Sequence, residues 1–389
     1  PTVTAGYSAS REQDPPGALA PVPSSNAFLY NLFTPQVSVS FVPDVFGLNR
    51  RTVESVRAQE QAVRYQLIAT DITLSSNVAT AAIQLASLQA QVDATDKLVE
   101  INTKIVQILQ YQYSKGYASR LDLAAQESQL AQTSATLPPL RLQLAQQRDQ
   151  LAVLTGHFPS EAPTETVDLA SLHLPTDLPV TLPSQLVEQR PDVLQAEANL
   201  HAASAQIGIA EANRLPNLTL SGTAGHTGLA VGQTFASGSG FWNLAAELTA
   251  PIFDGGALLH QQRAAKANYA QAAAQYRSAV LTAFQNVADT LAALDQDADA
   301  LQATAKAANA AKLTLDLSQR QWKSGYASQL TLLNAEQADL QAQVALVQAQ
   351  ASRFADTAAL FQALGGGWWN RNDLAVNAAT RNESNRNPR

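Results

Sequence analysis

The side chains that most often carry catalysis or bind metal ions are few and widely spaced in this sequence. Cysteine is absent, which excludes a thiol nucleophile, a thiolate metal site and a disulfide framework. The five histidines show no HxxxH or similar metal-binding spacing, and they are His157, His173, His201, His226 and His260. No G-x-S-x-G or P-loop sequence is present. The sequence therefore predicts a protein that is not an enzyme and that uses no metal ion or other cofactor.

Two further kinds of binding site are disfavoured by the residue pattern. Gly225, Gly228 and Gly232 superficially resemble a phosphate-binding loop, but neither the helix nor the lysine of such a loop follows them. They are better interpreted as part of a loop between two strands. The net charge of -7 argues against a nucleic-acid partner, because phosphate binding requires a basic surface.

A repeated tetrapeptide is the most informative feature of the chain. Gly-Tyr-Ala-Ser occurs twice, as Gly116, Tyr117, Ala118 and Ser119 and again as Gly325, Tyr326, Ala327 and Ser328. The same offset of 209 positions relates Gly47 to Gly256 and Gly156 to Gly365. Because glycines keep this register over a long stretch, we interpret the chain as two copies of one structural plan.

Each copy contains a very long helical segment. The 68 residues between Gly47 and Gly116 include neither glycine nor proline, and the same holds between Gly256 and Gly325. At 1.5 Å per residue, each segment would form a rod of roughly 100 Å. A second helix is predicted after each tetrapeptide, so each copy reads as a long helical hairpin whose tip is Gly-Tyr-Ala-Ser. Pro138 and Pro139 predict a kink or break in the first returning helix.

Upstream of each long helix the pattern changes to strict alternation. Val37, Val39 and Phe41 alternate with serines, and a similar alternation occurs near Leu218 and Leu244. Each copy therefore begins with a β-hairpin, which gives four strands for the whole chain. A membrane-spanning barrel needs about eight or more strands, so this chain could close one only together with other copies. A soluble four-stranded sheet packed on helices is the alternative, although rods of such length fit it poorly.

The resulting organisation has seven segments. They are a first β-hairpin at 1–46, a first long helical hairpin at 47–156, a Pro-rich equatorial linker at 157–189, a helix at 190–215, a second β-hairpin at 216–255, a second long helical hairpin at 256–365, and an equatorial and C-terminal tail at 366–389. The helix at 190–215 has no counterpart before the first hairpin. The repeat therefore predicts a matching helix upstream of residue 1.

Several stretches resemble the TolC-like outer-membrane efflux proteins, in the branch that serves tripartite drug and metal pumps. They are RPDVLQAEANLHAASAQIGIAEANRLPNLTLSG, PIFDGGALLHQQRAAKANYAQA, ALGGGWW and both hairpin tips. The resemblance implies an α+β membrane protein: a homotrimer with a 12-stranded β-barrel in the outer membrane, continuous with a long periplasmic α-helical barrel. It further implies a gated exit duct for small molecules, a periplasmic adaptor and an inner-membrane pump as partners, a role in antibiotic resistance, and an N-terminal lipid anchor upstream of this chain.

The resemblance also implies two functional sites. Both Gly-Tyr-Ala-Ser tips correspond to the family tips that meet the adaptor. Asp122 matches an acidic position of the periplasmic constriction, whereas Thr331 and Asn334 stand where many relatives carry aspartates. Arg120 and Arg141 are the nearest basic residues that could balance a ring of Asp122 carboxylates. The alternatives are that the tips are only turns and that Asp122 is an ordinary solvated helix charge.

The rival function is that of a non-transporting trimeric coiled-coil scaffold or adhesin. Such a protein could also use the long helical segments. It would have no need of alternating strands with a lipid-compatible face. Ion conduction in a planar bilayer separates the two functions, because a duct must conduct and a scaffold must not.

Overall fold

The computed structural model describes residues 1–13, 29–161, 169, 172–174 and 189–370. Most of the predicted equatorial linker at 157–189 and of the tail at 366–389 lies outside these residues. The chain divides into two compact units, one of residues 1–61 with 197–275 and one of residues 62–196 with 276–389.

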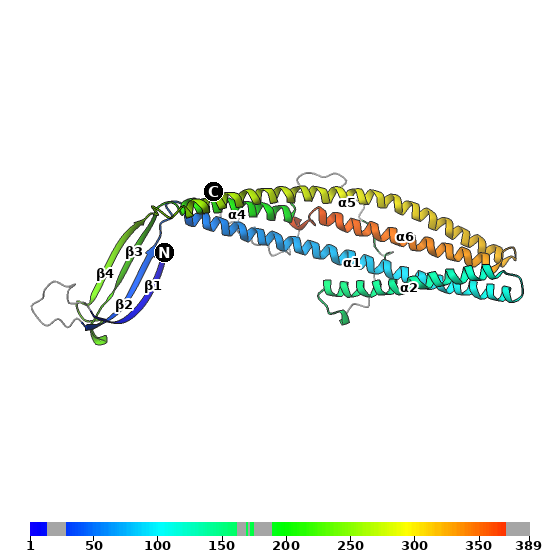
Figure 1. Cartoon of the computed structure of the whole chain (residues 1–389), viewed down its shortest axis with the longest axis horizontal. Coiled ribbons are helices and arrows are strands. Elements are labelled where there is room, and N and C mark those ends of the chain that lie inside the picture. The colour runs from blue at the N-terminus through cyan, green and yellow to red at the C-terminus, as the bar shows by residue number, and fades with distance from the viewer. Residues whose placement is uncertain (14–28, 162–168, 170–171, 175–188, 371–389) are drawn as a thin grey trace, which may run out of the picture. The chain divides into compact units, whose positions relative to one another are not determined.

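The first unit contains a four-stranded antiparallel sheet (Figure 1). Its strands are β1 (Thr2–Gln13), β2 (Leu29–Phe41), β3 (Asn217–His226) and β4 (Gly240–Thr249), and they pair in the order β1-β2-β3-β4. The two predicted β-hairpins therefore lie side by side, joined by the pairing of β2 with β3. Within the described residues, β1 and β4 are edge strands whose outer backbone groups have no partner strand.

The register of the sheet separates apolar from small polar side chains. Val39 lies opposite Val3 on one side and Gly222 on the other, and Gly222 in turn lies opposite Leu244. Residues directly opposite each other share a face, so apolar residues from all four strands gather on one face. They include Val3, Val37, Phe41, Trp242, Leu244 and Leu248, each more than a third exposed. The other face is small and polar, with the Ser38 and Thr223 hydroxyls 3.3 Å apart.

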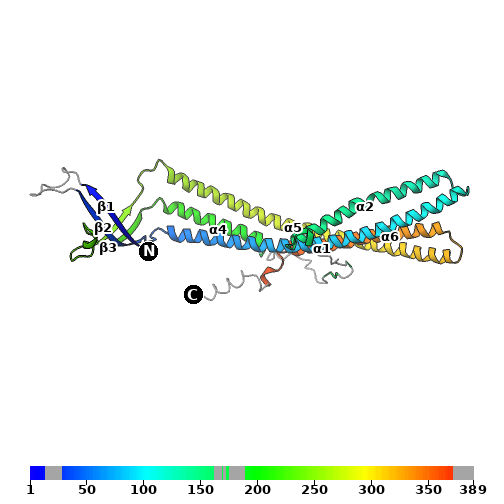
Figure 2. The same cartoon turned by 90° about the horizontal axis from the view of Figure 1, so that it is seen from below.

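Long helices make up most of the remaining chain (Figures 1 and 2). The helices α1 (Leu48–Ser114) and α5 (Ala257–Lys323) have 67 residues each, and α2 (Arg120–Leu154) and α6 (Gln329–Ala363) have 35 each. Between the copies lies α4 (Pro191–Ala212). Short 3-10 turns cover Pro159–Glu161, Val231–Gln233 and Trp368–Asn370. The equal helix lengths in the two copies follow from the equal spacing of their glycines.

No helix in the described part of the chain has both the length and the apolar character needed to cross a membrane.

Of the kink or break predicted at Pro138 and Pro139, the break does not occur, since α2 runs unbroken through both residues. Each of the two prolines lacks a backbone N–H, so two carbonyls of the preceding turn have no helical hydrogen-bond partner. Both prolines and Ala135 are exposed, so water can hydrate that side of the helix. The neighbouring Leu137 is buried and holds α2 on its packed face. Packing on one side and hydration on the other therefore keep the helix continuous.

The core of the second unit consists of small clusters strung along the helices. Near the tips, a cluster joins three helices through Ile101, Ile105, Val106 and Leu109 of α1, Leu123 of α2, and Leu333 of α6. The fully buried Asn102 lies in the same stretch, where its Nδ2 donates to the Leu98 carbonyl and its Oδ1 accepts from Gln126. The first hairpin and α6 are thus packed against each other close to the two tips.

A buried arginine ties together the beginning of α4, the middle of α5 and the end of α6. The Arg190 guanidinium donates to the Ala363 carbonyl at 2.6 Å and to the Ala283 carbonyl at 3.4 Å. It also forms a two-point ion pair with Asp192, at 3.0 and 2.7 Å. The Arg190 side chain is only 8% exposed, so these bonds are shielded from water.

Candidate functional site

The two Gly-Tyr-Ala-Ser tips have the same backbone geometry. Gly116 and Gly325 have φ angles of 78° and 77°, in the left-handed region that favours glycine. The Tyr117 N–H donates to the Gln112 carbonyl at 2.8 Å, and the Tyr326 N–H donates to the Gln321 carbonyl at 2.9 Å. This six-residue closure is a Schellman turn, which ends a helix at a glycine. The two hairpins therefore reverse the direction of the chain with the same turn geometry.

The tips present large aromatic side chains to the surroundings. Tyr117 is 84% exposed and Tyr326 is 88% exposed, although each has a sizeable apolar ring. The alanines differ between the tips, since Ala118 packs against the core cluster near the tips and Ala327 does not belong to it. Exposed aromatic rings on a short rigid turn form a surface suited to another protein, because such rings bury much area at little entropic cost.

Asp122 is placed in the first turn of α2 by the cap of that helix. The Asp122 carboxylate accepts from the Ser119 N–H at 3.3 Å and from the Ser119 hydroxyl at 2.7 Å. In return, the Asp122 N–H donates to the Ser119 hydroxyl oxygen at 3.1 Å. This is a capping box, and Asp122 remains exposed within it. The same side chain could therefore stabilise the helix start and present a charge to solvent.

None of the other residues predicted for the gate forms a hydrogen bond or ion pair with Asp122 in the described structure. Thr331 occupies the equivalent cap in the second hairpin, where its N–H donates to the Ser328 hydroxyl at 3.1 Å. Asn334 is exposed one turn further along α6. Arg120 forms a weak ion pair with Glu127 at 3.8 Å, and Arg141 pairs with Asp96 at 2.8 Å. Neither arginine is used to balance the charge of Asp122 in this chain.

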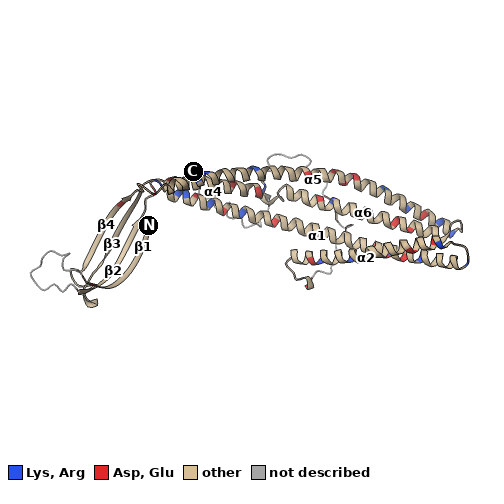
Figure 3. Cartoon of the chain, in the orientation of Figure 1, with Lys and Arg blue, Asp and Glu red and all other residues tan. Residues whose placement is uncertain are grey.

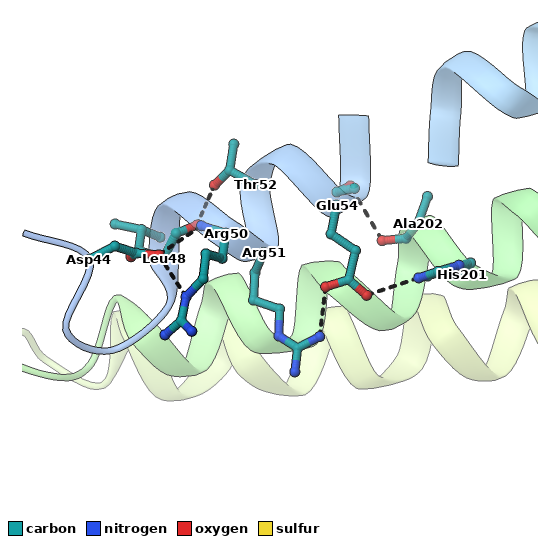
Figure 4. Close-up of polar contacts among 9 residues, drawn as sticks. Asp44, Leu48, Arg50, Arg51, Thr52, Glu54, His201 and Ala202 are labelled. Atoms are coloured by element: carbon teal, nitrogen blue, oxygen red, sulfur yellow. Dashed lines mark hydrogen bonds and ion pairs between the residues drawn. The ribbon is translucent and has the colours of Figure 1, made fainter. Parts of the chain in front are cut away.

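The start of α1 carries a network of charged residues (Figure 4). The Asp44 carboxylate accepts from the N–H groups of Asn49 and Arg50, each at 2.9 Å. Burial raises the pKa of Asp44, but these two bonds and the Arg50 guanidinium outweigh it and hold the pKa below its ordinary value. Hydrogen bonds from His201 and Arg51 lower the pKa of Glu54.

The second copy has an equivalent junction between strand and helix. Asp254 accepts from the N–H groups of Gly256 at 2.9 Å and Leu258 at 2.7 Å, which lowers its pKa. An aspartate therefore caps the long helix directly after the sheet in both copies.

A carboxyl pair joins α5 and α6 in the second hairpin. Asp297 of α5 and Asp356 of α6 lie close together, and Oδ2 of Asp297 is buried without a hydrogen-bond partner among the described residues. Two ionised carboxylates this close would repel each other, so the site favours the protonated form of Asp297. Burial, then the hydrogen bond and charge of Asp356, raise the pKa of Asp297, while Arg353 opposes the shift.

This pair makes the stability of the second hairpin dependent on pH. Because the pKa of Asp297 is raised, its stabilising contribution is present in acid and is lost as pH rises through the raised pKa. Asp297→Asn supplies an amide donor to Asp356 at any pH. We therefore expect the variant to melt at a higher temperature than the unmodified protein at about pH 8 and at a similar temperature near pH 4. Circular dichroism of both proteins measures this, with Asp299→Asn on the exposed side of α5 as the control. Identical pH profiles of the two proteins would contradict the raised pKa of Asp297.

Sequence reasoning named Ser119 as a tip residue and Asp122 as a gate residue, but it missed the capping box that they form. The two residues match the S-x-x-D form of a capping box, which could have been recognised as a helix start. Asp44 and Asp254 could have been recognised as caps from their place just before the long helices. Asp297 and Asp356 are 59 positions apart on different helices, and no local pattern joins them.

Charged residues are unevenly distributed (Figure 3). The strands carry only Arg11, Glu12 and Glu247, whereas the helices carry many charges of both signs. Among the described residues, no group of three or more histidine, aspartate or glutamate side chains could hold a metal ion.

Comparison with known proteins gives a consistent result. The family model described as "Outer membrane efflux protein" matches residues 1–157 and 182–366. The pyoverdine export outer membrane protein OpmQ of Pseudomonas putida is 30% identical over 336 residues, which cover 86% of this chain and 71% of OpmQ. The toluene efflux pump outer membrane protein TtgC of the same species is 29% identical over 385 residues, which cover 98% of this chain and 78% of TtgC.

The fold is also shared with solved structures. The crystal structure of the outer membrane protein VceC from Vibrio cholerae superimposes with a TM-score of 0.79 at 26% identity. The match covers 94% of this chain and 87% of VceC. The mixed arrangement of a small sheet and very long helices is therefore common to both proteins.

Proposed function

The chain belongs to the outer membrane efflux protein family, and from this membership we propose that three copies form the gated exit duct of a tripartite pump. The protein acts in the outer membrane as an efflux protein. The proposal adds a homotrimer, a 12-stranded barrel, and contacts with a periplasmic adaptor and an inner-membrane pump. The relatives export substances as different as pyoverdine and toluene, so efflux of small molecules is the shared activity.

The open sheet is the observation that best supports the proposal of a trimer. The edge strands β1 and β4 leave rows of unpaired backbone groups, and a lipid environment offers no water to satisfy them. Antiparallel pairing of β4 with β1 of the next copy would satisfy both edges. Four strands from each of three copies give a barrel within the known range for outer-membrane proteins. The exposed apolar face of the sheet would then face lipid.

Two measurements on the purified protein test this function. Light scattering in detergent should give the mass of a trimer, because closure needs more strands than one chain has. Insertion of the trimer into a planar bilayer should produce stepwise ion currents. A monomeric protein, or a trimer that never conducts, would contradict the proposed duct and favour a scaffold.

We further propose that Asp122 lines the constriction near the tips, with Thr331 and Asn334 at the equivalent level of the second hairpin. Asp122→Asn removes the charge but keeps an oxygen that can accept from the Ser119 N–H, so the cap should survive. We expect the variant trimer to lose much of the preference for cations, because three carboxylates near the axis attract them.

The reversal potential in a salt gradient measures this preference. Thr331→Asp is the converse variant, since it adds a carboxylate at the corresponding cap and should increase cation selectivity. Should both variants give the reversal potential of the unmodified protein, Asp122 does not lie at the constriction.

A further inference from the structure

An open hollow of about 670 Å³ lies on the four-stranded sheet, at the end of the sheet that carries the loop between β3 and β4. All four strands contribute to its lining, and Phe235 of the loop lines it as well. The volume falls in the range of roughly 300–1,000 Å³ that is typical of pockets for small ligands. Because its lining comes from one sheet and one loop, the hollow is complete in a single copy of the chain.

The pairing register assigns the hollow to the apolar face of the sheet. Four of its lining residues stand opposite one another in one row across the strands, namely Ala5, Val37, Ala224 and Trp242. Side chains alternate along a strand, so Val37 shares its face with Val39 of the apolar row described above. Gln36 and Phe241 also border the hollow, but by the same alternation their side chains belong to the opposite face. The hollow therefore opens on the face that would meet lipid in the proposed barrel.

The hollow results from a small residue that no neighbouring side chain covers. In the next row of the same face, Leu244 leans over Gly222, and its Cδ2 lies 3.0 Å from the place where a Cβ of residue 222 would stand. Ala224 is the corresponding small residue of the hollow, and the space beside it stays open. Trp242 and Phe235 border this space and are 75% and 74% exposed, although their rings are large and apolar.

Hydrogen bonds within the loop hold Phe235 in place. The ring of Phe235 packs on the ring of His226, with 5.2 Å between the ring centroids. The Ser239 hydroxyl donates to the Thr234 carbonyl at 2.8 Å. A hydroxyl has only one proton, so Ser239 accepts from the His226 Nδ1–H, at 3.0 Å. The Nε2 atom of His226 forms no hydrogen bond within the described residues and remains available to a polar group.

We propose that the hollow holds one acyl chain of a membrane lipid, with the polar part of that lipid near His226. The proposal rests on the barrel proposed above, in which hydrocarbon chains surround this face. A chain in the hollow contacts apolar atoms on several sides, whereas a chain on the flat part of the sheet contacts them on one side. The walls are already in place, so binding costs little ordering of the protein. This lipid therefore exchanges more slowly than the lipids around it.

Trp242 lines the hollow and is a natural reporter of its occupant. The trimer in detergent is titrated with a phosphatidylcholine whose acyl chains carry bromine, which quenches the fluorescence of a tryptophan in contact with it. A Trp242→Phe trimer gives the fluorescence of the other tryptophans, which is subtracted. We expect the Trp242 fluorescence to fall to a plateau while the lipid is still a minor component of the micelle, with one lipid bound per chain.

Two matched variants show whether the lipid lies in the hollow. Ala5→Phe places a ring inside the hollow, whereas Ala9→Phe places the same ring on the same strand and face outside it. Ala5→Phe should raise the lipid fraction at half quenching by at least about tenfold, because the loss of about two methylene contacts is worth this factor. Ala9→Phe should titrate like the unmodified protein. Light scattering shows whether both variants remain trimers.

Three outcomes would overturn the inference while leaving the proposed duct intact. They are quenching that rises only in proportion to the lipid fraction, equal titrations of Ala5→Phe and the unmodified protein, and removal of the plateau by toluene, which would assign the hollow to an apolar solute. A separate measurement tests the barrel itself. In vesicles made entirely of the brominated lipid, Trp242 must be quenched if this face of the sheet meets lipid, so unquenched Trp242 would contradict the proposed barrel.

Discussion

Replacing Ala327 by glutamate is expected to abolish efflux while leaving the trimer intact. Ala327 lies at the second tip beside Tyr326, which is 88% exposed, and does not belong to the core cluster near the tips. The glutamate side chain would sterically prevent a partner helix from packing closely against the tip. Its charge would also be costly to desolvate at an interface. The drug susceptibility of a strain that carries the variant as its only copy should equal that of a strain lacking the protein.

Ala327→Ser is the matched control, because it keeps the small profile and should retain efflux. Ala118→Glu is less informative, since Ala118 packs against the core cluster and its replacement would disturb the first hairpin itself. Light scattering shows whether each variant is still a trimer. Normal resistance in a strain with trimeric Ala327→Glu protein would mean that the second tip is not a docking surface.

Arg190→Met is expected to destabilise the helical unit clearly. The guanidinium donates hydrogen bonds to the carbonyls of Ala283 and Ala363. The variant would remove both of these bonds in a site that is shielded from water. Ala363 lies at the end of α6, so leaving its buried carbonyl without a donor costs on the order of 2 kcal/mol, whereas the Ala283 carbonyl lies inside α5 and keeps its helical partner. The cost for Asp192 is smaller because its side chain is 43% exposed and can be hydrated. The apparent melting temperature of the helical circular dichroism signal should fall clearly.

Two further variants show whether the effect comes from this geometry. Arg190→Lys keeps the charge but cannot reach both Asp192 and the Ala363 carbonyl with a planar fork, so an intermediate loss is expected. Arg214→Met removes an exposed arginine that donates to Gln262 at 2.6 Å, and it should change the melting temperature little. Equal melting temperatures of Arg190→Met and Arg214→Met would show that the hydrogen bonds of Arg190 do not stabilise the packing of the three helices.

The sequence by itself determined the local plan of each copy. The spacing of Gly47, Gly116 and their counterparts 209 positions later defined helix length and tip position, because glycine readily adopts the left-handed conformation at which a helix ends. Strict alternation defined the strands, because side chains alternate between the faces of any sheet. Even the caps at Asp44 and Ser119 depend on neighbours within six residues. Such features are encoded within a few turns of chain and need no knowledge of the fold.

Only the tertiary structure decided which distant segments meet. It brought Arg190 to the end of α6, 173 positions away, and Asp297 to Asp356 across two helices. It also kept α2 continuous through Pro138, where a proline inside a helix favours a break. Leu137 is buried on one side of the helix, and the other side is hydrated. Gln91 and Gln348 look like ordinary helix-surface residues in sequence, yet the Gln348 Nε2 of α6 donates to the Gln91 Oε1 of α1. Such contacts depend on how the helices pack, and packing is a sum of many weak contacts that no single stretch of sequence specifies.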